Sequence, residues 1–114
     1  MGTTVSVVIC AHTERRWQDL CDAVASVAAQ GHPAEEIIVV IDHNDALLAR
    51  AEAALDGVVV VANWGTPGES GARNAGVAVA SGEVIAFLDD DATADEGWLA
   101  ALLPWFGDPE VLGV

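Results

Sequence analysis

The fold is decided by the stretch Val84-Ile85-Ala86-Phe87-Leu88-Asp89-Asp90-Asp91, in which five apolar residues run directly into three carboxylates. The apolar part is continuous rather than alternating and has the length of one strand, which is typical of a parallel strand buried on both faces. Three runs of the same kind precede it in the chain: Val5–Cys10, Ile37–Ile41 and Val58–Ala62. We therefore expect four strands in one parallel sheet.

Helical patterns lie between and after these strands. Four segments have helical length, apolar spacing or end signals, namely Trp17–Gln30, Asp45–Leu55, Gly71–Ala80 and Glu96–Phe106. Asn44 precedes the second as an N-cap, and Thr93 and Glu96 have the spacing of a capping box at the fourth. Strands that alternate with helices predict an α/β fold with right-handed crossovers. Val111–Val114 has the pattern of a fifth strand that has just begun, so we expect a C-terminally truncated part of a larger domain.

The composition fits one globular domain with few basic groups. Its 114 residues are 53% hydrophobic, which is enough for a packed core. The net charge of −14, with four arginines and no lysine, argues against a nucleic-acid partner and makes each arginine conspicuous if the ligand is anionic. No apolar run approaches the roughly 20 residues of a membrane span. The N-terminus does not have the pattern of a signal peptide, so we expect a cytoplasmic protein with Cys10 and Cys21 as buried thiols.

Polar residues follow each of the expected strands. In an open parallel sheet, ligands bind outside the carboxyl ends of the strands. The clusters that would meet there are His12-Thr13-Glu14, Asp42-His43-Asn44, the loop 63–70 and Asp89-Asp90-Asp91. Their convergence predicts a ligand site at one edge of the sheet.

The three adjacent aspartates are the sharpest chemical feature. They cannot all be ionised cheaply unless a cation or solvent screens them. Mg²⁺ and Mn²⁺ prefer one or two carboxylates together with substrate phosphate oxygens. Strand alternation would turn Asp89 and Asp91 to one side and Asp90 to the other. The alternative is a solvated acidic turn with Asp95 capping the next helix, but beside the other clusters we favour a divalent metal.

A glycine-rich segment, Gly68–Gly76, follows the third strand. Its glycines, Gly71 among them, let the backbone approach a ligand, and a helix that begins after Ser70 offers its first amides to an anion. Arg73 in that first turn is placed to contact a base or a diphosphate. The segment is neither a P-loop, which needs a lysine, nor the dinucleotide fingerprint, which follows the first strand.

Four strings in this order carry a family resemblance: Val5-Ser6-Val7-Val8-Ile9, Glu36-Ile37-Ile38-Val39-Val40 leading to Asp42, Gly71-Ala72-Arg73-Asn74-x-Gly76, and Gly82 through Asp91. Together they resemble glycosyltransferase family 2, whose members have the Rossmann-like GT-A fold. The match spans nearly all of the chain and is specific, because four separate motifs must coincide. It departs at Ile41-Asp42-His43-Asn44, where Asp-Asp-Gly-Ser is common in the family.

The resemblance implies a role for each matching residue. The nucleotide base would be lined by Ala11, His12, Thr13 and Glu14. The rest of the nucleotide would be held by Asp42 on the base, expected to be uracil, by Gly71 and Arg73, and by Asp90 or Asp89 on the ribose. The Mn²⁺ or Mg²⁺ that bridges the diphosphate would be held by Asp91, with Asp89.

Without the resemblance, several of these residues have plainer interpretations. Asp42 would be a helix-capping acid and His12 a surface loop residue. The remaining arginines, Arg15, Arg16 and Arg50, are most simply solvated helix charges.

The family implies transfer of a sugar from a nucleoside-diphosphate donor to an acceptor hydroxyl, with inversion at the anomeric carbon. Residues 1–114 would supply the donor site, and the acceptor region and the general base would be absent. We therefore expect the isolated chain to bind donor and to turn over little or nothing. The acceptor is open between a glycan, a lipid-linked glycan and a small molecule, and any membrane contact would come through missing C-terminal segments.

Two rival functions remain. The first is a non-catalytic nucleotide-binding module, a relative that keeps only the donor-binding edge of the sheet. A response-regulator-like domain would use Asp42 and the acidic cluster to hold Mg²⁺ for phosphorylation, but it lacks the lysine of such receivers and leaves the Gly-Ala-Arg-Asn turn unexplained.

Overall fold

The computed structural model describes residues 4–31, 34–95 and 97–102. Its centre is a four-stranded sheet in the order β3-β2-β1-β4, in which every pairing is parallel. The strands are β1 (Val5–Ala11), β2 (Glu36–Asp42), β3 (Val59–Asn63) and β4 (Val84–Asp89). The predicted parallel α/β fold is confirmed.

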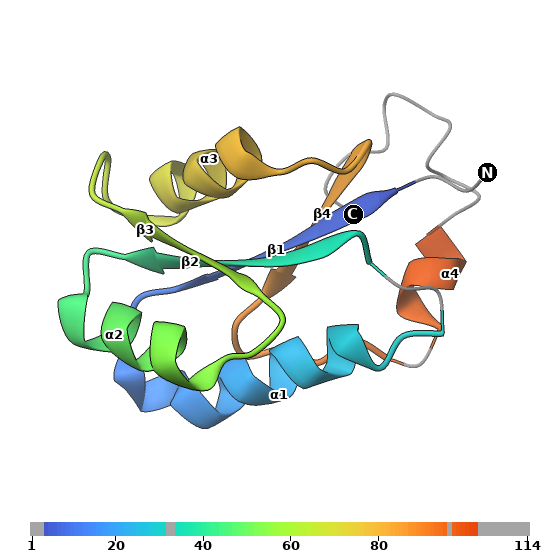
Figure 1. Ribbon diagram of the computed structural model, residues 1–114, viewed down its shortest axis with the longest axis horizontal. Coiled ribbons are helices and arrows are strands. Elements are labelled where there is room, and N and C mark those ends of the chain that lie inside the picture. Colours follow the sequence, from blue (N-terminus) through green and yellow to red (C-terminus); the bar gives the residue numbers. More distant parts are fainter. Residues whose placement is uncertain (1–3, 32–33, 96, 103–114) are drawn as a thin grey trace.

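Helices cover both faces of this sheet (Figure 1). Helices α1 (Trp17–Ala28) and α2 (Asp45–Ala54) lie on one face, and α3 (Glu69–Val79) lies on the other. The short 3₁₀ helix η1 (Glu14–Arg16) precedes α1, and α4 (Trp98–Leu102) follows β4. None of the helices within the described ranges is long and apolar enough to cross a bilayer.

The two faces of the sheet have separate apolar cores. Val5, Val7 and Ile9 of β1 belong to the core beneath α1 and α2, whereas Val8 belongs to the core beneath α3. This alternation follows from the period of two in a strand, and it explains why the central strands are apolar without interruption. Helix α3 packs close to the sheet, because a Cβ at Gly76 would lie 2.6 Å from Val8 Cγ1.

Several helix ends differ from the predictions. The third helix begins at Glu69 rather than Gly71, so Arg73 lies one turn inside it. The first helix ends at Ala28 rather than Gln30, and it is preceded by the extra turn η1, which ends at Arg16. Asn44 does cap α2, accepting a hydrogen bond from the Leu47 amide at 2.9 Å. The proposed capping residue Glu96, the end of the fourth predicted helix and the fifth strand at 111–114 lie outside the described residues.

Candidate functional site

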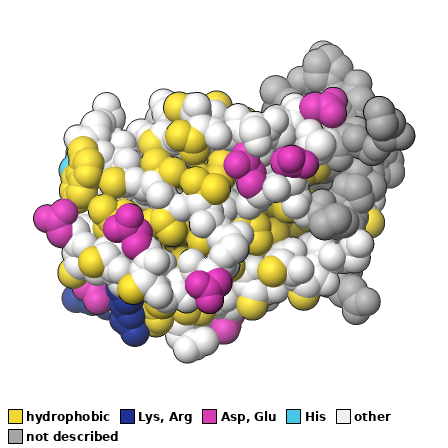
Figure 2. All heavy atoms as spheres, in the orientation of Figure 1, with side chains coloured by type: hydrophobic (Ala, Val, Ile, Leu, Met, Phe, Trp, Pro, Cys, Tyr) yellow, Lys and Arg dark blue, Asp and Glu magenta, His cyan; other side chains and the backbone are white. Residues whose placement is uncertain are grey.

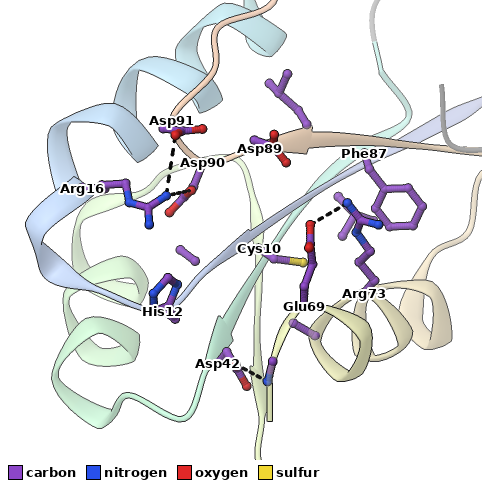
Figure 3. Close-up of a pocket in the computed structure, with 15 residues that line it drawn as sticks. Cys10, His12, Arg16, Asp42, Glu69, Arg73, Phe87, Asp89, Asp90 and Asp91 are labelled. Carbon is purple, nitrogen blue, oxygen red and sulfur yellow. Dashed lines mark hydrogen bonds and ion pairs between the residues drawn. The ribbon is translucent and has the colours of Figure 1, made fainter. Parts of the chain in front are cut away.

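A cavity of about 400 Å³ opens at the carboxyl edge of the sheet. It lies between the ends of β1, β2 and β4 and the first turns of α3 (Figure 3). Its lining brings together seven of the residues that the sequence singled out: Ala11, His12, Asp42, Arg73, Asp89, Asp90 and Asp91. The predicted convergence of chain segments at this edge is therefore present in the fold.

Three other predicted residues do not line this cavity. The Thr13 hydroxyl accepts a hydrogen bond from the Arg15 amide at 3.2 Å and so caps η1. A carboxylate oxygen of Glu14 lies 3.8 Å from the Arg50 guanidinium, on the surface. Gly71 packs against the preceding loop, where a Cβ would lie 1.8 Å from the Thr66 carbonyl oxygen. Gly71 thus shapes the start of α3 rather than the cavity wall.

The three aspartates leave the sheet in a tight turn. Strand β4 ends at Asp89, and the Ala92 amide donates to the Asp89 carbonyl at 3.1 Å. Strand alternation therefore stops at Asp89, and the expectation that Asp91 lies on the opposite side from Asp90 is wrong. Both side chains approach the same nitrogen, Arg16 Nη1, at 3.1 Å from Asp90 Oδ1 and 3.7 Å from Asp91 Oδ2.

Arg16 is the main residue that the sequence interpretation misplaced. Instead of a solvated helix charge, it is a cavity-lining group that pairs with two carboxylates more than 70 positions away in the chain. No local pattern marks such a pairing. The only available signal was the scarcity of arginine in an acidic chain.

Asp90 is the buried member of the acidic cluster. Its side chain is only 8% exposed, and its Oδ2 has no hydrogen-bond partner among the described residues. Burial raises the pKa of Asp90 above its ordinary value, although the Arg16 guanidinium acts in the opposite direction. A buried carboxylate oxygen without a partner is a costly arrangement, and a donor or a cation would complete it.

These carboxylates suit a divalent cation that takes some of its ligands from the protein and the others from a bound molecule. Within the described residues, no group of three or more ligating side chains is arranged as a complete cage. Mg²⁺ and ions like it are commonly held by only one or two carboxylates, while phosphate oxygens and water complete the coordination. The carboxylates of Asp89, Asp90 and Asp91 all line the cavity and supply that kind of oxygen donor.

Asp42 is tied into the structure by three hydrogen bonds. Its Oδ1 accepts from His43 Nδ1 at 2.7 Å and from Asn63 Nδ2 at 2.9 Å, and its Oδ2 accepts from the Gly68 amide at 2.8 Å. Burial acts to raise the pKa of Asp42, but these hydrogen bonds outweigh it and hold the pKa below its ordinary value. The helix-capping alternative is excluded, because Asn44 caps α2.

Asn63 begins the polar loop 63–70 that the sequence placed at this edge, but the sequence assigned it no role of its own. It is buried at the end of β3, and its Nδ2 also donates to the Thr66 carbonyl at 2.9 Å. Its Oδ1 accepts from the Gly65 amide at 3.2 Å. Together with Asp42, Asn63 therefore fixes the loop that leads into α3.

The far wall of the cavity carries one more ion pair (Figure 3). Arg73 Nη2 lies 2.6 Å from Glu69 Oε1, and the Arg73 guanidinium lies 5.2 Å from the centre of the Phe87 ring. Cys10 lines the same cavity, and burial raises its pKa to about 11, against the lowering effect of Arg73. Its thiol is therefore protonated near neutral pH. The expectation of two buried thiols is not met, because Cys10 and Cys21 are both only partly buried.

Comparison with known proteins identifies the family. A sequence model described as "Glycosyl transferase family 2" matches residues 6–114. The chain belongs to glycosyl transferase family 2. The resemblance noted in the sequence motifs is thereby confirmed.

Relatives of this family 2 chain include both sequences and solved structures. A glucosyl-dolichyl phosphate glucuronosyltransferase from Haloferax volcanii is 32% identical over 114 residues, covering 96% of this chain and 36% of the relative. The mannosyltransferase PcManGT from Pyrobaculum calidifontis, solved with GDP-Man and Mn²⁺, is 25% identical with a TM-score of 0.72, covering 97% of this chain and 34% of the other. S. aureus TarS in complex with UDP-GlcNAc is 23% identical with a TM-score of 0.67, covering 94% and 32%.

These structural neighbours are GT-A glycosyltransferases, and the parallel sheet of this family 2 chain has the same fold. The chain spans about a third of the length of these relatives.

Proposed function

We propose that this chain carries the donor site of a glycosyltransferase that transfers a sugar from a nucleoside diphosphate to an acceptor hydroxyl. The observation that carries the proposal is that one cavity gathers Asp42, Arg73 and the three aspartates that end and follow β4. Structures similar to this one contain GDP-Man with Mn²⁺ in one case and UDP-GlcNAc in another.

On this proposal, each part of the nucleotide would meet a group in the cavity or beside it. Ala11 and His12 offer a wall for the base, while Thr13 and Glu14 shape the turn behind it. Asp42 would accept a hydrogen bond from the base, which we expect to be uracil, and Asp90 or Asp89 would accept from the ribose hydroxyls. Arg73 would contact the nucleotide, and Gly71 would set the position of the helix that carries it.

The charge of the cavity supports the use of a metal. The charged side chains that line it are five carboxylates and two guanidiniums: Asp42, Glu69, Asp89, Asp90 and Asp91 against Arg16 and Arg73. A diphosphate would be repelled from such a site unless it arrived with a cation. We therefore propose that Asp91, with Asp89, holds Mn²⁺ or Mg²⁺ beside the diphosphate. A bound cation of this kind would neutralise negative charge on the leaving diphosphate.

We further propose that residues 1–114 form the donor part of a longer enzyme. An acceptor region and a carboxylate general base would then come from elsewhere in that protein. The acceptor hydroxyl would belong to a glycan, a lipid-linked glycan or a small molecule. On this proposal the isolated chain binds donor without turnover.

Calorimetric titration tests the donor site directly. UDP and GDP would be titrated into the chain with and without Mn²⁺, beside Asp91→Asn and the matched control Asp22→Asn, whose exposed side chain lies on α1. We expect binding that requires Mn²⁺, prefers UDP, weakens at least about tenfold in Asp91→Asn and persists in Asp22→Asn.

Two outcomes would change the proposal. A folded chain that binds neither nucleotide, with or without Mn²⁺, would contradict a donor site here. Binding without sugar transfer by a longer protein that includes the acceptor region would instead favour the non-catalytic nucleotide-binding module.

A further inference from the structure

Arg16 occupies the place at which the acidic cluster needs positive charge. One nitrogen, Nη1, serves both Asp90 Oδ1 at 3.1 Å and Asp91 Oδ2 at 3.7 Å (Figure 3). The Arg16 side chain is 38% exposed, whereas that of Asp90 is 8% exposed. The ion pair therefore has a solvent-facing arginine at one end and a buried carboxylate at the other.

This pairing leaves the cluster incompletely satisfied. Asp90 lines the cavity, its buried Oδ2 has no hydrogen-bond partner among the described residues, and the Arg16 guanidinium faces two carboxylates. Arg16 is attached to η1, a three-residue turn that includes no buried residue. A long, half-exposed side chain on such a turn can exchange one partner for another at little energetic expense.

We propose that Arg16 is the resident counter-ion of Asp90 and Asp91, and that it hinders a divalent cation from binding until an anionic diphosphate gives the guanidinium a new partner. This inference rests on the proposed donor site and adds a control on the order of binding there. A cation that approaches Asp91 alone meets the repulsion of the Arg16 guanidinium. A cation that arrives with a diphosphate does not, because the phosphate oxygens accept from the guanidinium.

Such an arrangement couples the two ligands. If the diphosphate relieves the repulsion between Arg16 and the cation, each ligand tightens binding of the other by the same factor. Removing the positive charge should therefore strengthen binding of the cation alone and weaken the coupling. Loss of a merely structural arginine would instead weaken both the binding of the cation alone and the coupling. The opposite signs of the two effects therefore identify the counter-ion role.

The experiment measures free Mn²⁺ by electron paramagnetic resonance during titration of the chain, first without nucleotide and then with UDP. Arg16→Gln keeps the length of the side chain and removes the charge, whereas Arg16→Lys keeps the charge. Arg50→Gln is the matched control, because Arg50 lies over the Trp17 ring at 4.3 Å and does not line the cavity.

We expect Arg16→Gln to bind Mn²⁺ alone about tenfold more tightly than the unmodified chain, within the usual range of coupling between sites. Arg16→Lys and Arg50→Gln should change this affinity little. The gain should disappear in the double variant Arg16→Gln/Asp91→Asn, which separates this site from other acidic groups on the surface. UDP should tighten Mn²⁺ binding by a smaller factor in Arg16→Gln than in the unmodified chain.

The outcomes distinguish this inference from the proposed function. Equal affinities of folded Arg16→Gln and the unmodified chain for Mn²⁺ alone would overturn the role of Arg16, even if UDP binds both. A gain that survives in the double variant would overturn it as well. Tighter Mn²⁺ binding in Arg16→Gln, with no nucleotide binding by any variant, would support the counter-ion role of Arg16 and contradict the donor site.

Discussion

Asp42 and Asn63 form a polar pair at the ends of two neighbouring strands, where each side chain satisfies the other. Asn63 Nδ2 donates both to Asp42 Oδ1 and to the Thr66 carbonyl, each at 2.9 Å. Asp42 Oδ2 in turn accepts from the Gly68 amide, immediately before α3 begins. The amide of Asn63 therefore controls how the loop is presented to the cavity.

Replacing Asn63 should loosen this loop and destabilise the chain. Asn63→Ala leaves the Thr66 carbonyl and the Gly65 amide without their side-chain partner, so we expect the free energy of unfolding to fall by about 1–3 kcal/mol. Urea unfolding measures this loss. Gln18→Ala, at an exposed position on α1, is the control and should have little effect.

Exchanging the amide and the carboxylate between positions 42 and 63 tests the direct interaction of these two side chains. Asn63→Asp would bring a second carboxylate to Asp42 and should be more destabilising than Asn63→Ala. The reciprocal double variant Asp42→Asn/Asn63→Asp again pairs one amide with one carboxylate, so it should recover part of the loss. A double variant less stable than Asn63→Asp would contradict a direct interaction between the two side chains.

At the scale of elements, the position of α3 depends on the contact between its first turn and the loop before it. Gly71 lies so close to Thr66 that an added Cβ would come within 1.8 Å of the carbonyl oxygen. Helix α3 also carries Arg73 and Glu69, so its first turn cannot shift without moving the far wall of the cavity.

Gly71→Ala tests this close approach, because two effects of opposite sign compete. Alanine in a helix is favoured over glycine by roughly 0.5–1 kcal/mol, whereas overpacking costs about 1–3 kcal/mol. We expect a net loss of stability in chemical denaturation and weaker binding of UDP with Mn²⁺ by calorimetry. Gly31→Ala is the control, since a Cβ there would meet no atom of the described residues within 4 Å. A Gly71→Ala chain more stable than Gly31→Ala would show that the loop yields freely.

The same elements show how far sequence alone can reach. The predicted run Ile37–Ile41 lies within β2, which has one further residue at each end. It could be recognised because every residue of a strand that is buried on both faces tends to be apolar. The pairing of Arg16 with Asp90 was not foreseeable, since its partners are 74 positions apart and neither belongs to a periodic pattern. The turn at Asp90 and Asp91 likewise depends on a backbone hydrogen bond that residue type does not specify.

At the scale of the whole molecule, the dominant feature is excess negative charge. The chain carries 18 acidic residues against four arginines, for a net charge of −14. On the face drawn in Figure 2, carboxylates are scattered widely, while arginine side chains gather at one corner. Three of the four arginines are already engaged with carboxylates, as the ion pairs of Arg16, Arg50 and Arg73 show. Most of the carboxylates therefore have no arginine to pair with, and they repel one another.

This repulsion predicts that salt stabilises the chain. The screening length falls from about 30 Å at 0.01 M to about 10 Å at 0.1 M and about 3 Å at 1 M, so repulsion between distant carboxylates weakens first. For a chain of 114 residues, a gain of about 1 kcal/mol corresponds to a rise of about 4 °C in the midpoint of thermal unfolding. We expect at least that rise between dilute buffer and about 0.5 M KCl.

A charge reversal on the surface separates screening from other effects of salt. Glu52→Lys, at an exposed position on α2, should raise the midpoint in dilute buffer and should lose most of that advantage at high KCl, because screening already removes the repulsion it relieves. Sucrose stabilises through exclusion from the surface without screening, so it should leave the difference between the two chains unchanged. A midpoint that stays constant with KCl, or an advantage of Glu52→Lys that persists in high salt, would mean that long-range repulsion does not limit the stability of this chain.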